Sequence, residues 1–339
     1  MSRAGEPTHA GPADAAPDRS AHASPPPPLV RSLVRLARPK QWTKSAFVLV
    51  GPLYGFADKL ESEPGLSPWA IVVPALLAAL AFSLASSGCY VVNDILDREA
   101  DREHPRKRSR PLAAGDVSVG AARLWAGVLF AASAATLAGV PESVRWWLAA
   151  ALGLYVANVF AYSFYFKHKV IGDVISLSLG FVLRVVGGCV AIAIVPTTWL
   201  LNVSFFLSMF LAFGKRLGER RTLATGDADE GARAVAHRRV QSRYTDTLLQ
   251  MAVVVTAVAT LLTYAGYVQD NPTPGPLGFN PLWLTLVPAT YGLLRAIVLL
   301  ETGKFDDPTT LAFHDRGFLA AGLLFALLTA AAFVSAAGF

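Results

Sequence analysis

The most regular feature of the chain is the recurrence of long apolar stretches separated by short polar connections. A helix needs about 20 mainly apolar residues to cross a bilayer, and stretches of this kind recur from residue 45 onward. The pattern therefore predicts an all-α integral membrane protein of about nine transmembrane helices. The predicted spans, the first of them short, are 45–57, 68–92, 118–138, 145–166, 173–194, 198–213, 246–267, 280–300 and 317–338.

Composition supports this prediction and sets the domain limits. Of the 339 residues, 53% are hydrophobic and 16% are charged, which is more apolar than a soluble domain of this size. Residues 1–28 are rich in proline and alanine and lack the apolar stretch of a secretory signal. We expect them to form a disordered cytoplasmic tail before a single transmembrane domain at 29–339. Cys89 and Cys189 lie in apolar segments, where small buried hydrophobes are expected instead of a disulfide or a zinc site.

The charged residues alternate between connections. The loops near 195–198 and 268–279 contain no lysine or arginine, whereas the connections at 93–117, 167–172 and 214–245 are basic. By the positive-inside rule, the N-terminus and the basic loops face the cytoplasm, which suits an inner cell membrane. Setting this topology and contacting anionic lipid head groups accounts for most of these cations. It does not account for the carboxylates in the same loops.

Three carboxylates follow the second span at helical spacing, namely Asp94, Asp97 and Asp101, with Asn93 before the first. If the helix continues, the three share one face, where they repel one another unless cations neutralise them. Mg²⁺ prefers oxygen ligands and keeps positions open for substrate phosphates. The motif therefore predicts a magnesium site, and the alternative is a solvated helix end paired with neighbouring arginines.

A basic segment comes directly after the carboxylates. Pro105 and Pro111 break the helix around Lys107 and Arg110, which keeps these cations close to the acidic motif. Arginine forks onto phosphate oxygens and lysine acts as a point charge. Both suit the excess negative charge of a metal-bound diphosphate.

A second set of polar residues surrounds the fifth span. Tyr165, Lys169 and Asp173 are spaced by four, and Arg184 follows eleven residues later, so one helix would place all four on one face. Arg184 lies within an apolar run, where an ionisable residue is a functional candidate by default. An internal ion pair that fixes helix packing is the alternative for Arg184.

The polar segment before the first span contains a tryptophan between cations. Trp42 suits a membrane-interface anchor. Arg38 and Lys44 could hold a lipid phosphate or only set topology, and Lys44, closest to the span, is the better candidate for substrate binding.

The acidic motif at 93–101, followed by Lys107-x-x-Arg110-Pro111 and about nine helices, resembles the UbiA-type superfamily of membrane transferases. The resemblance covers nearly the whole chain from residue 31. It implies helices around a central cavity that opens to the cytoplasmic side.

Three further features are similar to one branch of that superfamily: Arg38-Pro39-x-Gln41-Trp42-x-Lys44, Tyr165-x-x-x-Lys169, and the basic loop from Lys215. Members of this branch transfer 5-phosphoribosyl from 5-phosphoribosyl 1-diphosphate to a polyprenyl (decaprenyl) phosphate and release diphosphate. Relatives that prenylate aromatic rings carry a second Asp-x-x-x-Asp motif, whereas here Leu177 stands four residues after Asp173. A smaller departure from the branch is Ser45, where asparagine is expected.

The resemblance implies a role for each candidate residue. Asp94 and Asp97, assisted by Asp101 and Asn93, would hold Mg²⁺ on the donor diphosphate. The acceptor phosphate is already an anion, so it can attack without a strong general base. Lys169 joins Asp94 and Asp97 in the predicted catalytic set. The predicted substrate-binding residues are Lys44, Asn93, Lys107, Arg110, Tyr165, Asp173 and Arg184.

Two alternatives stay open at this stage. The first is transfer of a prenyl group from prenyl diphosphate to a small or aromatic acceptor, which uses the same first motif. The second is a membrane transporter or lipid carrier in which Lys169, Asp173 and Arg184 line a pathway, although no internal repeat is found. Membrane lipids are expected partners and nucleic acid is not. The oligomeric state is left open, with a homo-oligomer among the possibilities.

Overall fold

The computed structural model describes residues 28–104, 107–225, 244–271, 279–302 and 315–336. Every regular element in these ranges is a helix. In chain order they are α1 (Leu29–Ala37), η1 (Pro39–Ser45), α2 (Ala46–Tyr54), α3 (Phe56–Ser62), α4 (Trp69–Leu96), α5 (Arg98–Glu103), α6 (Pro111–Ala114), α7 (Val119–Thr136), η2 (Leu137–Gly139), α8 (Glu142–Phe164), η3 (Phe166–His168), α9 (Gly172–Ala191), α10 (Thr198–Thr225), α12 (Asp246–Asp270), η6 (Pro281–Thr285), α13 (Leu286–Glu301) and α15 (Arg316–Ala336).

Within the described ranges, seven helices are long and apolar enough to cross a membrane: 69–96, 119–139, 142–168, 172–191, 198–218, 246–270 and 281–301. The last predicted span corresponds to α15, whose apolar part, Arg316–Ala332, is shorter. The prediction of an all-α membrane protein is confirmed, but the count of nine spans is not. The predicted tail, apart from Pro28, lies outside the described residues.

The first predicted span, 45–57, is not one helix. The chain passes through the 3₁₀ helix η1 and then through α2 and α3, with Gly55 between the last two. Pro52 inside α2 lacks the N–H that would continue the hydrogen-bonding pattern. At nine residues, α2 is too short to cross a bilayer by itself.

The short α2 is held in the core by close backbone packing on α9. A Cβ atom at Gly188 would lie 1.7 Å from the carbonyl oxygen of Val48, and one at Gly51 would lie 2.2 Å from Sγ of Cys189. Small residues let helices approach to this distance and gain dispersion energy over a large contact. Cys89 and Cys189 are both free and buried.

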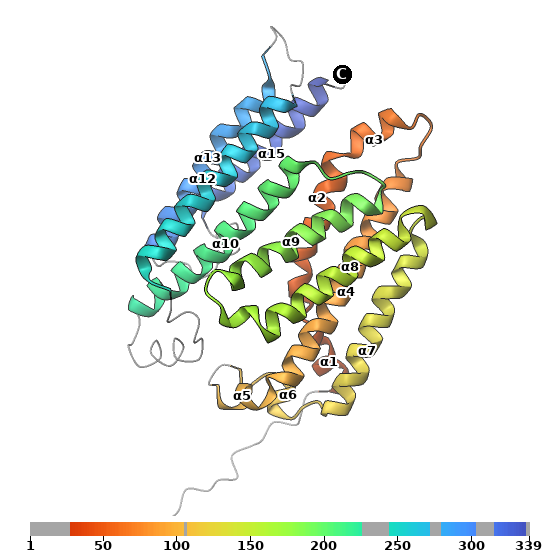
Figure 1. Ribbon diagram of the computed structural model, residues 1–339, viewed down its shortest axis with the longest axis vertical. Coiled ribbons are helices and arrows are strands. Elements are labelled where there is room, and N and C mark those ends of the chain that lie inside the picture. Colours follow the sequence, from red (N-terminus) through yellow and green to blue (C-terminus); the bar gives the residue numbers. More distant parts are fainter. Residues whose placement is uncertain (1–27, 105–106, 226–243, 272–278, 303–314, 337–339) are drawn as a thin grey trace, which may run out of the picture.

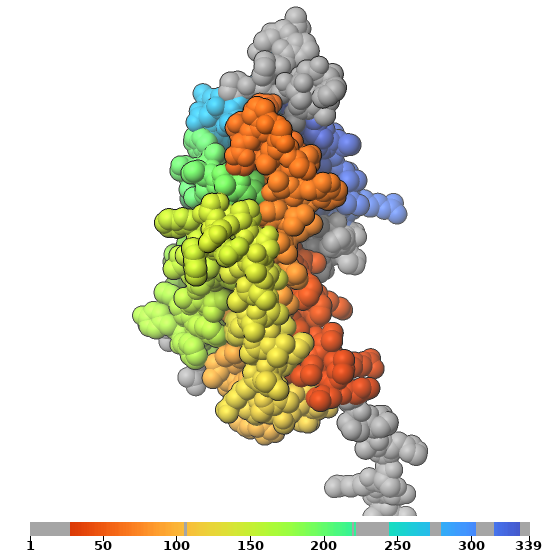
Figure 2. Space-filling model, turned by 90° about the vertical axis from the view of Figure 1, so that its right-hand side faces the viewer, coloured from red at the N-terminus to blue at the C-terminus, as the bar shows by residue number. Residues whose placement is uncertain are grey.

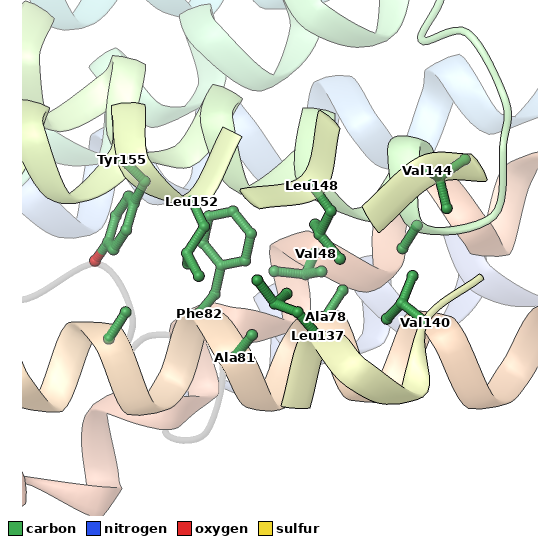
Figure 3. Close-up of a cluster of buried hydrophobic side chains, with 12 residues drawn as sticks. Val48, Ala78, Ala81, Phe82, Leu137, Val140, Val144, Leu148, Leu152 and Tyr155 are labelled. Carbon is green, nitrogen blue, oxygen red and sulfur yellow. The ribbon is translucent and has the colours of Figure 1, made fainter. Parts of the chain in front are cut away.

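The helices form two groups that meet along α10, which packs against both α9 and α12 (Figure 1). One group contains α2, α4, α7, α8 and α9. Its apolar core includes Phe82, Leu148 and Tyr155 (Figure 3). The other contains α12, α13 and α15, with a core around Leu249, Leu300 and the end of α10.

Large apolar side chains also cover the outer surface. Leu124, Trp146, Leu262 and Leu327 are among those that are largely exposed, and each is on a different long helix. Apolar exposure on this scale is unusual for a soluble protein and suits contact with lipid tails.

The short helices α1, α5 and α6 gather at one end of the molecule, where α4 also ends (Figure 1). Figure 2 shows α1 and η1 beside α7 at this end. Nε1 of Trp125 on α7 donates to the carbonyl of Leu33 on α1 at 3.0 Å. The fold thus brings the first polar segment to the acidic motif at the end of α4.

Candidate active site

The acidic motif spans the junction between α4 and α5. α4 ends at Leu96, and α5 begins at Arg98. The N–H groups of Asp97 and Asp101 still donate to the carbonyls four residues earlier, at 2.9 and 2.8 Å. The predicted continuation of the helix is therefore correct for the hydrogen bonds, with an irregularity at Asp97.

Asp94 and Asp101 share a partner that lies between them. Nη1 of Arg110 donates to Asp94 at 3.1 Å and to Asp101 at 2.6 Å. Nη2 of Arg38 donates to the same oxygen of Asp94, and Nζ of Lys107 lies 3.6 Å from Asp101. Both carboxylates are buried, at 3% and 2% exposure. A buried carboxylate is stable only when it is paired, so the three cations are needed to keep the two charges.

Asp97 has a different environment. Its carboxylate is half exposed, and its ion-pair partner is Lys167, 3.5 Å away on the connection between α8 and α9. Among the described residues, no three His, Cys, Asp or Glu side chains form a group that could hold a metal ion by themselves. The structure thus brings two of the three predicted metal ligands together and aims the third at a neighbouring loop.

The oxygen donors nevertheless fit a metal that arrives with its substrate. Oδ1 of Asn93 is buried and has no hydrogen-bond partner among the described residues. Unpaired buried acceptors are uncommon, and this one lies next to Asp94. Mg²⁺ is usually held by one or two carboxylates plus substrate phosphates, so a complete protein cage is not required.

Tyr165, Lys169 and Asp173 do not share one helix, which corrects the sequence prediction. α8 ends at Phe164 and α9 begins at Gly172, so the first two residues lie on the connection. Both are exposed, and Nζ of Lys169 is 5.2 Å from the centre of the Tyr165 ring. This cation–π contact keeps the predicted pair together near Lys167.

Asp173 is fully engaged inside the protein. Nε and Nη2 of Arg216 donate to one carboxylate oxygen at 3.1 and 2.5 Å. The hydroxyl of Tyr244 and the N–H of Val174 donate to the other at 2.6 and 2.8 Å. Burial, and next the hydrogen bond to Asp173, raise the pKa of Tyr244 above its usual value, so the hydroxyl stays protonated. This geometry gives Asp173 a structural position that joins α9 to α10 and to the segment just before α12.

The turn before α9 adopts an unusual backbone conformation. Ile171 has φ = 67°, a value that is rare for a β-branched residue. Its N–H donates to the hydroxyl of Tyr244 at 2.6 Å. Residues in such conformations cost about 1–3 kcal/mol and are found often at functional sites.

Arg184 is 5% exposed and has no carboxylate partner in the described part of the chain. Nη2 donates to the hydroxyl of Tyr155 at 2.7 Å and Nη1 to the carbonyl of Gly180 at 3.3 Å, while Nε has no partner among the described residues. The alternative of an internal ion pair is therefore not supported. Lys44, the other predicted cation, is half-buried in η1 with no ion pair among the described residues.

Sequence reasoning missed three residues of these networks: Lys167, Arg216 and Tyr244. It considered Arg38 but preferred Lys44. All four contact carboxylates that are distant in sequence, so spacing along one helix gives no sign of them.

A pocket of about 290 Å³ lies elsewhere, between α10, α12, α13 and α15. Its lining is almost entirely apolar, with Leu207, Leu293 and Phe318 among its residues. It is distant in sequence from the acidic motif. The predicted central cavity opening to the cytoplasmic side is not confirmed by this pocket.

The fold and the site define a multi-pass α-helical membrane protein with a buried aspartate–arginine cluster at the end of one span. Residues 56–314 match the UbiA prenyltransferase family, and the chain belongs to this family. It is 34% identical, over 86% of its length and 83% of the relative, to a decaprenyl-phosphate phosphoribosyltransferase of Corynebacterium glutamicum. It is 33% identical, over 87% of its length and 90% of the relative, to a protein of the same name from Mycolicibacterium smegmatis.

Solved structures show the same fold. A UbiA homologue from Archaeoglobus fulgidus bound to GPP and Mg²⁺ superposes with a TM-score of 0.62 at 19% identity, covering 90% of this chain and 99% of that one. An Aeropyrum pernix homologue gives a TM-score of 0.54 at 16% identity, covering 91% of this chain and 98% of that one. A member of this fold has thus been crystallised with Mg²⁺ bound.

Proposed function

We propose that the protein transfers 5-phosphoribosyl from 5-phosphoribosyl 1-diphosphate to a polyprenyl phosphate, with decaprenyl phosphate as the expected acceptor, and releases diphosphate. The observation that carries this proposal is the cluster of Arg38, Lys107 and Arg110 around Asp94 and Asp101. It offers oxygen ligands and phosphate-binding cations at one point. The relatives that match along most of the chain are named for this reaction.

The residues divide into those that hold a metal and those that hold phosphate. Asp94, Asp97 and Asp101, with Asn93, would hold Mg²⁺, which supplies charge stabilisation to the departing diphosphate. To bind the metal ion, Asp97 would have to release its ion pair with Lys167. The freed lysine would then pair with a phosphate oxygen of the donor. Such an exchange keeps an opposite charge beside both Asp97 and Lys167.

The phosphate-binding residues are cations around the acidic motif. Arg38, Lys107 and Arg110 already surround the carboxylates, so their remaining N–H donors are positioned for donor phosphate oxygens. Lys169, with Tyr165, would meet the donor or the lipid phosphate from the α8–α9 connection, and Lys44 would do so from η1. Catalysis would rest on positioning and on neutralising charge.

The site belongs on the cytoplasmic side of the inner cell membrane. The connections that bear the acidic motif, Lys167 and the end of α10 are the basic ones, and the positive-inside rule assigns them to the cytoplasm together with the N-terminus. A soluble, highly charged donor is available there, and the acceptor's tail can stay in lipid.

Prenyl transfer is the second candidate. The Archaeoglobus fulgidus homologue was crystallised with GPP and Mg²⁺, so the fold can bind a prenyl diphosphate. Against it, Asp173 is the sole carboxylate of the second motif in this chain and is occupied by Arg216 and Tyr244.

The test is turnover by the purified full-length protein in lipid nanodiscs with labelled phosphoribosyl diphosphate, decaprenyl phosphate and Mg²⁺. Labelled lipid should form, should stop when EDTA removes the metal, and should fall at least about 100-fold in Asp94→Asn. Glu142→Gln is the matched control. This exposed carboxylate lies at the first residue of α8, whereas the connection that carries Lys167 and Lys169 follows the last residue of that helix. Prenylation of an aromatic acceptor, without any labelled lipid, would refute the proposal in favour of prenyl transfer.

A further inference from the structure

Arg184 carries a positive charge that nothing in the described structure neutralises. It is 5% exposed, and its two described hydrogen bonds go to a neutral hydroxyl and a neutral carbonyl. An unpaired buried charge costs several kcal/mol, and an unpaired buried donor such as Nε adds to that cost. An anion that bound here would remove both penalties.

The guanidinium is held in a fixed orientation. Its central carbon lies 4.5 Å from the centre of the Tyr155 ring and 5.4 Å from that of Phe181. Figure 3 shows Tyr155 at the edge of an apolar cluster, with its hydroxyl oxygen pointing out of the cluster. That hydroxyl accepts from Arg184, and the side chain of Ser86 on α4 lies near it. A preorganised arginine of this kind loses little entropy when it binds a phosphate.

Through Tyr155, Arg184 lies near the face of α4 that bears Asp94, but farther from the end of that helix. Ser86 precedes Asp94 by eight residues, which corresponds to a rise of about 12 Å along α4. Arg38, which pairs with Asp94, lies over the ring of Tyr90, one turn from Ser86 and one turn from Asp94. Polar and aromatic side chains therefore connect the two cationic positions along α4.

We propose that Arg184, positioned by Tyr155, binds the 5-phosphate of the phosphoribosyl donor. This inference rests on the proposed function and adds to it, because it assigns the second phosphate of the donor to a residue. The donor carries a diphosphate on C1 and a phosphomonoester at the far end of the sugar. With the diphosphate held at Asp94, the 5-phosphate is tethered near Arg184, and the tether raises its effective concentration there.

The acceptor phosphate fits this position less well. It is the head group of a lipid, and reaching Arg184 would require it to leave the membrane surface for a position about 12 Å deeper. No second, tethered anion would offset the desolvation of that move. Arg184 would then serve specificity, because a prenyl diphosphate has no phosphate at its other end to neutralise the buried charge.

The experiment compares two ligands on the wild-type protein and on Arg184→Gln, by calorimetric titration in nanodiscs. Phosphoribosyl diphosphate with Mg²⁺ should bind about 10- to 150-fold more weakly to the variant, as expected for lost hydrogen bonds to a charged group. Inorganic diphosphate with Mg²⁺, which has no 5-phosphate, should bind equally to both proteins. In turnover, the KM for decaprenyl phosphate should stay unchanged.

Three results would overturn the inference: equal weakening of both ligands, no weakening of either, or a rise confined to the KM for the lipid acceptor. Failure of the wild-type protein to bind phosphoribosyl diphosphate would instead contradict the proposed function. If Arg184→Gln does not fold, Arg184→Lys and Tyr155→Phe replace it. Each keeps a cation at this position but loses part of the hydrogen bonding, so the preference for phosphoribosyl diphosphate should fall by about 3- to 10-fold in each.

Discussion

Replacing Asp173 by asparagine should destabilise the fold. Four hydrogen bonds converge on this carboxylate, and the side chains of Asp173 and Arg216 are only 4% and 11% exposed. Asparagine would remove the charge and direct its NH₂ group either at Arg216 or at the N–H of Val174, neither of which can accept a hydrogen bond. Leaving one partner of a buried pair uncompensated typically costs about 3–5 kcal/mol.

The assay is equilibrium unfolding of the purified protein in mixed micelles of mild detergent and dodecyl sulfate, followed by tryptophan fluorescence. Asp97→Asn is the matched control, because its carboxylate is half exposed and has one ion-pair contact at 3.5 Å. Its unfolding free energy should change by less than about 1 kcal/mol. If Asp173→Asn unfolds like the wild type but no longer binds phosphoribosyl diphosphate, the carboxylate is a substrate ligand and the structural argument is refuted.

Two further predictions concern helix packing and pH. Gly188→Ala should lower the unfolding free energy by about 3 kcal/mol, the upper end of the usual cost of overpacking, because its methyl group would overlap a carbonyl of α2. Gly127→Ala, with nothing within 4 Å, should be neutral or slightly stabilising in the same titration. A hydrogen bond from Arg295 and the N–H of Phe318 lower the pKa of Asp315 to about 2. Since this is below the value of about 3.9 in an unfolded chain, the pair's contribution is present above about pH 4 and is lost as the pH falls toward 2. Thermal unfolding of Asp315→Asn should lack this pH dependence, and an unchanged profile would contradict the assignment.

The hydrophobic pattern was sufficient to predict the fold class and the positions of most of the long helices. The spans beginning near 68, 118, 145, 173, 198, 246 and 280 correspond to long apolar helices. The first span was predicted wrongly as one helix. Its apolar residues satisfy the pattern, but Pro52 and Gly55 interrupt it, and the glycine contacts with α9 that hold it in place are tertiary.

The site was predicted in part. Their helical spacing correctly predicted that Asp94 and Asp101 lie close together, because α4 and α5 form one nearly continuous helical path. The same reasoning wrongly placed Tyr165 and Lys169 on one helix with Asp173, since the turn at Ile171 separates them from the helix that contains Asp173. The partners Arg38, Lys167 and Arg216 come from other elements, and sequence periodicity carries no information on such long-range contacts.

The conformation at Ile171 has a consequence for how distant elements respond to ligand. The N–H of Ile171 reaches Tyr244, and four residues earlier on the same connection Lys167 reaches Asp97. Any ligand that displaces Lys167 and shifts this connection must therefore change the free energy of the contact with Tyr244, two residues before α12 begins. By thermodynamic reciprocity, whatever loosens or tightens Tyr244 changes the affinity of the site by the same factor.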